Sequence, residues 1–346
     1  MQGKKSFGKR TGPKRRRKVT AETMVYEKRL DRRRLSGKGR AGALVLAVLF
    51  LLSALFTYGP RYAPGIPSWE TVFRKAGLSG AEGWLGTPLC VGFLDVGQGD
   101  SILVTCEGES LLVDAGPPGE DTKLLQTLRA AGVDHLDYVV ATHPHADHIG
   151  SFPELFRQIP VGVVILPEAD ARALEDPALY ERFLSAVRVS GASVELAWPG
   201  KRYALGRAEI RVLGPRFRSD NPNNISAVVR LTYHSVSFLF TGDAEEEEEL
   251  SLLAGEEELC ADVLKVGHHG SKTSSSEPFL RTVSPRYAVI SCGRGNDYGH
   301  PHDRTLENLT AIGAVVYRTD RDGTVLCGSD GTTLQWVRER GTLGSG

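Results

Sequence analysis

The sequence predicts an α/β domain with two sheets and outer helices over residues 89–346. Three observations lead to this fold class. Short apolar runs of strand character recur throughout these residues, helical patterns are interspersed among them, and histidine-bearing motifs occur where several strands end. With 346 residues in all, one or two domains are expected.

The first 40 residues form a strongly basic tail. They contain 16 Lys and Arg against 3 Asp and Glu, a net charge of +13, whereas the rest of the chain contains 26 against 39, a net of −13. Because residues 1–40 have almost no apolar pattern, they are expected to be disordered. A nucleic-acid-binding arm is one interpretation, but the apolar run that follows explains the charge more simply as a topogenic signal.

Residues 41–58 contain no charged side chain, and 18 apolar or small residues are just enough to cross a bilayer. A buried core helix would show polar positions at helical spacing. A cleaved signal peptide is the alternative, but the basic region before it is long and no small-x-small cleavage site follows. We therefore expect one transmembrane helix in the cell membrane, with residues 1–40 cytoplasmic and the following domain extracytoplasmic.

Residues 59–88 are rich in Pro and Gly and predict a linker, so the folded domain is expected at 89–346. Its strands are expected at 91–96, 101–106, 111–116, 138–141, 161–166, 193–198, 208–213, 227–233, 235–241, 263–266, 287–291, 314–318 and 324–327. Helices are expected near 122–131, 169–188, 244–255, 276–283 and 303–312. The five cysteines lack CxxC spacing, and buried thiols are the default expectation.

The strongest functional signal is the segment THPHADHIG at residues 142–150. In an extended backbone, the side chains of His143, His145 and Asp147 lie on one face, and His148 follows at the bend. Imidazole and carboxylate groups that converge in this way suit zinc or a related divalent ion. The alternative is a solvated histidine-rich loop, but four potential ligands at this spacing after an apolar strand favour a metal site.

Further chemistry-bearing residues follow other expected strands. Asp243 follows 235–241, the pair His268 and His269 follows 263–266, and His300 and His302 follow 287–291. A single aspartate after a strand is commonly a turn residue or a helix N-cap. Together, however, these motifs and the first segment bring seven of the nine histidines into three clusters, each beside Gly or Pro. We expect the clusters to form one site.

The motifs carry a family resemblance. HPHADH, with DVGQGD at 95–100 and LVDAG at 112–116, resembles the metallo-β-lactamase superfamily. The motifs NNIS at 223–226, TGD at 241–243, LKVGHHGS at 264–271 and YGHPH at 298–302 resemble those of the metallo-β-lactamase-like domain of ComEC-type DNA-uptake proteins and its stand-alone relatives. The resemblance runs from about Val91 to beyond His302, and DVGQGD and HHGS are its most specific motifs.

The resemblance implies an αββα sandwich that binds one or two divalent ions, Zn or Mn, at one edge. The positions that match the family's ligands are His143 and His145 for one ion, Asp147, His148 and one of His268 and His269 for the other, and Asp243 between them. Within the consecutive pair, His268 is slightly favoured. Where β-lactamases supply a further histidine, this sequence has Asn223, Asn224 and Ser226, which leaves the first ion short of protein ligands.

The implied chemistry is hydrolysis by a metal-bound hydroxide, formed because the ion lowers the pKa of its water. The residues expected to take part in catalysis are Asp147, Asp243, Lys265 and His300. Lys265, Ser271 and Lys272 are candidates for contact with a phosphate oxygen, although an exposed polar residue is an equally good interpretation of Lys272. His300 and His302 are candidates for stabilising a leaving group or binding phosphate, and buried packing histidines are the alternative. Asp95, Gln98, Asp100 and Asp114 are expected to orient the metal ligands.

The expected function is therefore a membrane-anchored phosphodiesterase or DNase, with DNA as the possible substrate and with unidentified DNA-uptake partners. The net charge of −13 outside the tail argues against avid, nonspecific binding of nucleic acid. One alternative is a hydrolase of a small ester, amide or lactam, since one fold hosts many reactions. The other is a metal-binding interaction module without catalysis.

Overall fold

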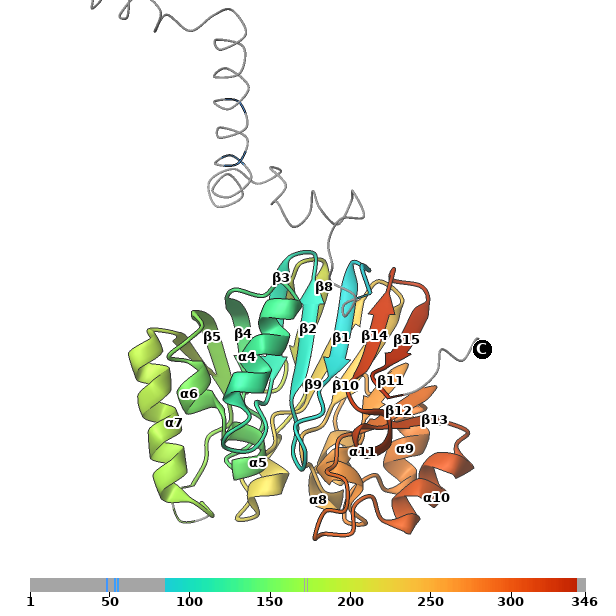
Figure 1. The fold of residues 1–346 in the computed structure, drawn as a ribbon. Coiled ribbons are helices and arrows are strands. Elements are labelled where there is room, and N and C mark those ends of the chain that lie inside the picture. The colour runs from blue at the N-terminus through green and yellow to red at the C-terminus, as the bar shows by residue number, and fades with distance from the viewer. Residues whose placement is uncertain are drawn as a thin grey trace, which may run out of the picture. The chain divides into compact units, whose positions relative to one another are not determined.

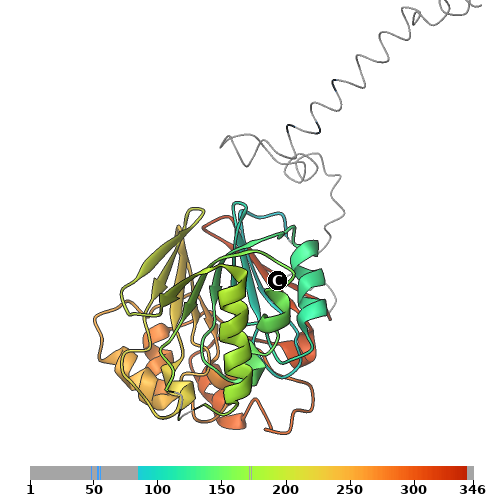
Figure 2. The same ribbon diagram turned by 90° about the vertical axis from the view of Figure 1, so that its left-hand side faces the viewer.

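Two β-sheets lie face to face, and helices cover their outer sides (Figures 1 and 2). This computed structural model describes residues 85–340 without 171 and 173, together with Val48, Ser53 and Leu55. The described residues 85–340 belong to one compact unit. The two-sheet α/β class predicted from the sequence is confirmed.

The larger sheet consists of β1 (Leu89–Phe93), β2 (Ile102–Cys106), β3 (Glu109–Val113), β4 (Leu136–Val140), β5 (Val161–Leu166), β6 (Ser193–Leu196), β14 (Val325–Ser329) and β15 (Leu334–Arg338). The smaller sheet consists of β7 (Arg202–Leu205), β8 (Ala208–Val212), β9 (Val229–Tyr233), β10 (Val236–Phe240), β11 (Val263–Lys265), β12 (Tyr287–Ile290) and β13 (Val315–Arg318). Two of these strands, β7 and β15, were not expected, because polar residues interrupt their short apolar patterns.

The strand order is β15-β14-β1-β2-β3-β4-β5-β6 in the larger sheet and β13-β12-β11-β10-β9-β8-β7 in the smaller sheet. Strands β3 to β6 are parallel to one another, as are β10 to β13. The loops that leave the carboxyl ends of β4, β10, β11 and β12 carry the motifs singled out above, and carboxyl ends of parallel strands meet at one edge of a sheet.

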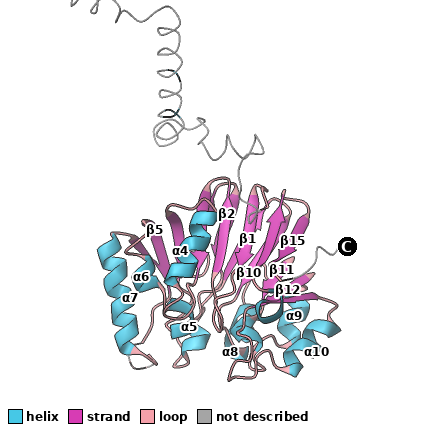
Figure 3. Ribbon diagram, viewed as in Figure 1, coloured by secondary structure: helices cyan, strands magenta, loops and turns pink. Residues whose placement is uncertain are grey.

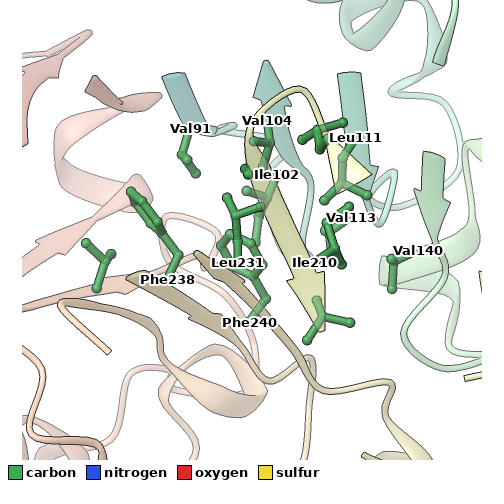
Figure 4. Close-up of a cluster of buried hydrophobic side chains, with 14 of the residues drawn as sticks. Val91, Ile102, Val104, Leu111, Val113, Val140, Ile210, Leu231, Phe238 and Phe240 are labelled. Atoms are coloured by element: carbon green, nitrogen blue, oxygen red, sulfur yellow. The ribbon is translucent and has the colours of Figure 1, made fainter. Parts of the chain in front are cut away.

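The core has three apolar layers. In β2, Ile102 and Val104 point into the layer between the sheets, whereas Leu103 points into the layer under the outer helices, as the alternation of a strand requires. The layer between the sheets also contains Phe238 and Phe240 from β10 (Figure 4). Each buried large apolar side chain contributes about 1.5–3 kcal/mol to folding.

The outer helices divide between the two sheets (Figure 3). Those packed on the larger sheet are α4 (Asp121–Ala130), α5 (Ala146–Ile149), α6 (Phe152–Leu155) and α7 (Pro177–Ser190), and those on the smaller sheet are α8 (Glu246–Leu253), α9 (Glu277–Val283) and α10 (Asp303–Ala311). Three short elements complete the set, α11 (Thr319–Asp322) and the 3₁₀ turns η1 (Pro222–Ile225) and η2 (Gly267–Gly270). Helix α7 begins later than expected because Asp176 caps it and accepts a hydrogen bond from the Leu179 N–H at 2.9 Å.

The single-pass localisation expected from residues 41–58 is wrong. Within the part of the chain that the structure describes, no helix is long and apolar enough to span a bilayer. A span needs about 20 apolar residues in one continuous helix, and the apolar composition of a run does not by itself supply that helix. The run lies outside the described residues except for Val48, Ser53 and Leu55, and the predictions for 1–40 and most of 59–88 also fall outside them.

Candidate metal centre

The segment after β4 leads into α5, which lies at the same end of the two sheets as α8 (Figure 1). The backbone is extended only as far as His145, which precedes the first turn of α5. Asp147 therefore lies on a helical turn and not on the extended run expected from the sequence, whereas His148 lies on the same turn, at the bend where it was expected. This change of conformation directs His148 inward, where it is fully buried, and leaves Asp147 partly exposed.

Asp114 holds this segment in place from the end of β3. Its Oδ1 accepts a hydrogen bond from the Thr142 N–H at 2.8 Å, and its Oδ2 accepts one from the Thr142 hydroxyl at 2.7 Å. The Nδ1 of His148 lies 2.7 Å from the same Oδ2, and all three residues are buried. An imidazole that donates from Nδ1 presents its Nε2 lone pair on the opposite side, so Asp114 aims His148 Nε2 at the site.

One group of potential ligands surrounds His148 and His269. The Nε2 atoms of these two rings lie 3.3 Å apart. His148 Nε2 is 3.2 Å from Asp243 Oδ1, and His269 Nε2 is 3.1 Å from Asp147 Oδ2 and 3.5 Å from Asp243 Oδ2. Of the consecutive pair, the structure places His269 in this group, whereas the sequence had slightly favoured His268.

A second group consists of His143, His145 and Asp243. The Nε2 of His143 lies 3.0 Å from His145 Nδ1 and 3.8 Å from Asp243 Oδ2. Ligand atoms of the three residues lie within 4.8 Å of one another. Asp243 therefore takes part in both groups, as expected for a carboxylate that lies between two ions.

The donor set fits divalent cations. Asp243 is 2% exposed, and its Oδ1 has no hydrogen-bond partner of good geometry among the described residues, although His148 Nε2 lies 3.2 Å from it. Burial raises the pKa of Asp243, but His269, His148 and His143 outweigh it and hold this pKa well below its ordinary value. Burial lowers the pKa of His148, but Asp243, Asp114 and Asp147 hold it well above the ordinary value. The surroundings thus favour positive charge at the centre of the cluster, which is what a metal ion supplies.

Lys265, a candidate from the sequence for contact with a phosphate oxygen, is fully buried in β11. Its Nζ lies 2.7 Å from Asp100 Oδ2 and donates to the Val266 carbonyl at 2.9 Å. The other oxygen of Asp100 lies 3.3 Å from His269 Nδ1, which is also 2.9 Å from the Ser291 carbonyl. Since the ammonium has no exposed surface, Lys265 acts on the site through Asp100 and His269 and not by contact with a phosphate.

His300 and His302 lie beside the ligands. The His300 ring stacks on Tyr298, with centroids 5.5 Å apart, and its centroid is 6.2 Å from that of His269. Burial and the neighbouring His269 lower the pKa of His300 to about 4. The Nδ1 of His302 accepts a hydrogen bond from the Lys272 N–H at 3.1 Å.

The remaining sequence-predicted residues divide between the site and its surroundings. Gln98 Oε1 accepts from the Gly293 N–H at 3.1 Å and so ties two site loops together. Ser271 is buried and bonds to Thr273, whereas Asp95 pairs with Arg340 away from the ligands. Sequence reasoning missed the contribution of Thr142, Ser291 and Glu245. Only Glu245 had a usable signal, as a carboxylate two positions after Asp243.

A sequence model of the family described as "Metallo-beta-lactamase superfamily" matches residues 94–294. Among curated proteins, ComE operon protein 3 of Bacillus subtilis is 32% identical over 254 residues, which cover 68% of this chain and 32% of that protein. Competence protein ComA of Neisseria gonorrhoeae is 32% identical over 291 residues, which cover 83% of this chain and 39% of that protein. The chain thus spans about a third of the length of these relatives.

Among solved structures, the metallo-beta-lactamase fold protein YhfI of Bacillus subtilis matches with a TM-score of 0.47 and 16% identity, over 66% of this chain and 96% of that one. The family match and the two curated relatives confirm the resemblance that the motifs HPHADH and HHGS carry.

Proposed function

Because this chain belongs to the metallo-beta-lactamase superfamily, we propose that it is a metal-dependent hydrolase of phosphodiesters, with DNA as the favoured substrate. The observation that carries the hydrolase proposal is the Asp243 carboxylate, which is buried, lacks a hydrogen-bond partner at Oδ1 and belongs to both ligand groups. A buried carboxylate among imidazoles is costly unless a cation compensates it.

The residues that would hold the ions are His143 and His145 on one side of Asp243, and Asp147, His148 and His269 on the other. When bound, a divalent cation supplies Lewis-acid polarisation of water and of a phosphoryl oxygen. The protein aims the imidazoles through Asp114 and the Ser291 carbonyl. The carboxylate of Asp147 is partly exposed, so it can accept a hydrogen bond from an attacking water and orient it.

Two observations favour a nucleic acid over a small ester, amide or lactam. Tyr298 is 64% exposed beside the site and stacks on His300, and nucleic-acid bases stack on exposed aromatic rings of this kind. The His302 ring lies 5.0 Å from that of His300 between centroids and accepts a hydrogen bond from the Lys272 N–H, so an imidazole and a positively charged residue are near the site for contact with phosphate oxygens. The relative from Neisseria gonorrhoeae is named a competence protein, which agrees with the resemblance of the motifs to those of DNA-uptake proteins.

The test is to incubate the full chain with single- and double-stranded DNA, chromogenic phosphodiesters and chromogenic esters, with Mn²⁺, with Zn²⁺ or with neither. We expect cleavage of DNA or of the phosphodiesters that depends on the ion, and its loss in His145→Ala with the fold intact. His135→Ala is the control, because the exposed ring of His135 bonds to Asp134 and Asp137 and to none of the proposed ligands. If neither ion supports cleavage of any phosphodiester, the substrate proposal fails; ester cleavage alone would indicate the small-ester alternative.

A further inference from the structure

The ligand group of His143, His145 and Asp243 has one protein ligand fewer than the group around His148 and His269. We propose that His268 completes it, so that the two consecutive histidines serve different ions. The inference rests on the proposed function in that it requires ions at the site, and it adds a ligand that neither the family motif nor the comparisons assign.

The distances place His268 at the correct range from the shared carboxylate. His268 Nε2 lies 3.8 Å from Asp243 Oδ2, and His143 Nε2 lies at the same distance, 3.8 Å, from the same oxygen. Two ligand atoms that each lie about 2.1 Å from one tetrahedral ion are about 3.4 Å apart. His268 lies outside the set of His143, His145 and Asp243 atoms that are within 4.8 Å of one another, so its ring has to rotate toward Asp243 Oδ2 for it to share an ion with His143.

The backbone explains how neighbouring residues reach different ions. Both histidines of η2 adopt the left-handed conformation, His268 at φ 49° and ψ 47° and His269 at φ 53° and ψ 22°. Their rings consequently lie 6.2 Å apart between centroids and at 69° to each other. Each left-handed residue other than glycine costs about 1–2 kcal/mol, and such conformations concentrate at functional sites.

Hydrogen bonds fix the orientation of His268 as they fix that of the other ligands. Its Nδ1 lies 3.1 Å from Glu245 Oε1, which leaves Nε2 free to face Asp243. The same arrangement holds for His148 with Asp114 and for His269 with the Ser291 carbonyl. A metal-binding histidine almost always donates its second ring N–H to such an acceptor.

The segment at η1, where β-lactamases have a further histidine ligand, instead helps to hold Glu245, the residue that orients His268. The side-chain amides of Asn221 and Asn223 donate to Glu245 at 2.7 and 3.2 Å, and the Thr273 hydroxyl donates to it at 2.9 Å. Glu245 is thus held from several directions while its Oε1 faces His268. Asn223, at the segment where β-lactamases have a histidine ligand, thus helps to orient His268 through Glu245.

The test is metal stoichiometry and affinity of the full chain, stripped of metal and titrated with Zn²⁺ under chelator competition, with elemental analysis after dialysis. We expect two ions in the wild type, and in His268→Asn one tight ion and a second whose affinity falls at least 100-fold. His234→Asn is the matched control, because His234 also has a left-handed φ, 52°, but lies exposed in the turn at the other end of β10. Asparagine tolerates this conformation at both positions.

Glu245→Gln tests the role of His268 without changing the sequence of η2. In this variant the affinity for the more weakly bound of the two ions should fall about 10- to 100-fold. If His268→Asn folds and binds two ions with the affinities of the wild type, the inference is overturned. If His268→Asn does not fold, unchanged metal stoichiometry and affinity in Glu245→Gln overturn it. A wild type that takes up no divalent ion contradicts the proposed function instead.

Discussion

Replacement of Glu248 by glutamine is expected to change how the free energy of unfolding depends on pH. Glu248 lies in α8 and has no exposed surface. Its Oε1 accepts a hydrogen bond from the Arg216 N–H at 3.2 Å, whereas its Oε2 has no partner among the described residues. Burial raises the pKa of this carboxyl to about 8, and Arg216 offsets the effect only in part.

The direction follows from which state binds the proton more tightly. An unfolded glutamate has a pKa of about 4.3, so at intermediate pH the folded protein keeps a proton that the unfolded chain has released. The contribution of Glu248 to stability is therefore fully present below the unfolded pKa and is lost as the pH rises through the folded pKa of about 8. At about 1.4 kcal/mol per pKa unit, the loss between pH 5 and 9 is about 4 kcal/mol.

Urea unfolding of the full chain and of Glu248→Gln, from pH 5 to pH 9 at constant ionic strength, measures this loss directly. The free energy of unfolding of the variant should rise relative to that of the wild type as the pH increases, by several kcal/mol over the range. Other titrating groups, such as Glu249, are present in both proteins and cancel in the difference. Two parallel curves would show that the Glu248 carboxyl is not held neutral by burial, and the reasoning would fail.

Two further substitutions probe the supports of the site. Lys265→Met should lower the free energy of unfolding by about 3–5 kcal/mol, because it leaves Asp100 buried without its 2.7 Å ion-pair partner. Thermal unfolding measures this loss, and the double variant Lys265→Met with Asp100→Asn should recover part of it. An unchanged melting temperature in Lys265→Met would contradict the burial of the ion pair. Asp114→Asn should reduce Zn²⁺ affinity about 10- to 100-fold with the fold retained. The single amide oxygen is needed by the Thr142 N–H, so the NH₂ group, which only donates, faces His148 Nδ1. Chelator competition measures the Zn²⁺ affinity, and Asp137→Asn, near the surface, is the control variant. Equal Zn²⁺ affinities in the two variants would show that Asp114 does not orient His148.

The gathering of distant residues at one edge was predictable from the sequence. The residues that end β4, β10 and β11 lie near one another because parallel strands bring their carboxyl ends to the same edge. The motifs therefore indicated that His143, Asp243 and the pair at 268 and 269 would meet, and their atoms lie within a few ångströms in the structure.

Other features depend on detail that a sequence does not carry. Which of His268 and His269 faces His148 depends on two successive residues in the left-handed conformation, and this conformation cannot be predicted from an apolar pattern. Lys265 stands in an apolar run, VLKV, and only the pairing of β11 with its neighbours shows that its side chain points inward to Asp100. Hydropathy alone led to the localisation drawn from residues 41–58, which the structure corrects.

A carboxylate common to both ligand groups makes them thermodynamically dependent on each other. An ion that binds beside His143 draws charge from Asp243 and fixes its orientation, which changes the affinity of the group around His148 and His269. By linkage, the second ion must alter the affinity of the first by the same factor. Binding of metal to the two sites should thus be cooperative. Cooperativity is positive if alignment of the Asp243 carboxylate by the first ion dominates, and negative if repulsion between the two cations dominates.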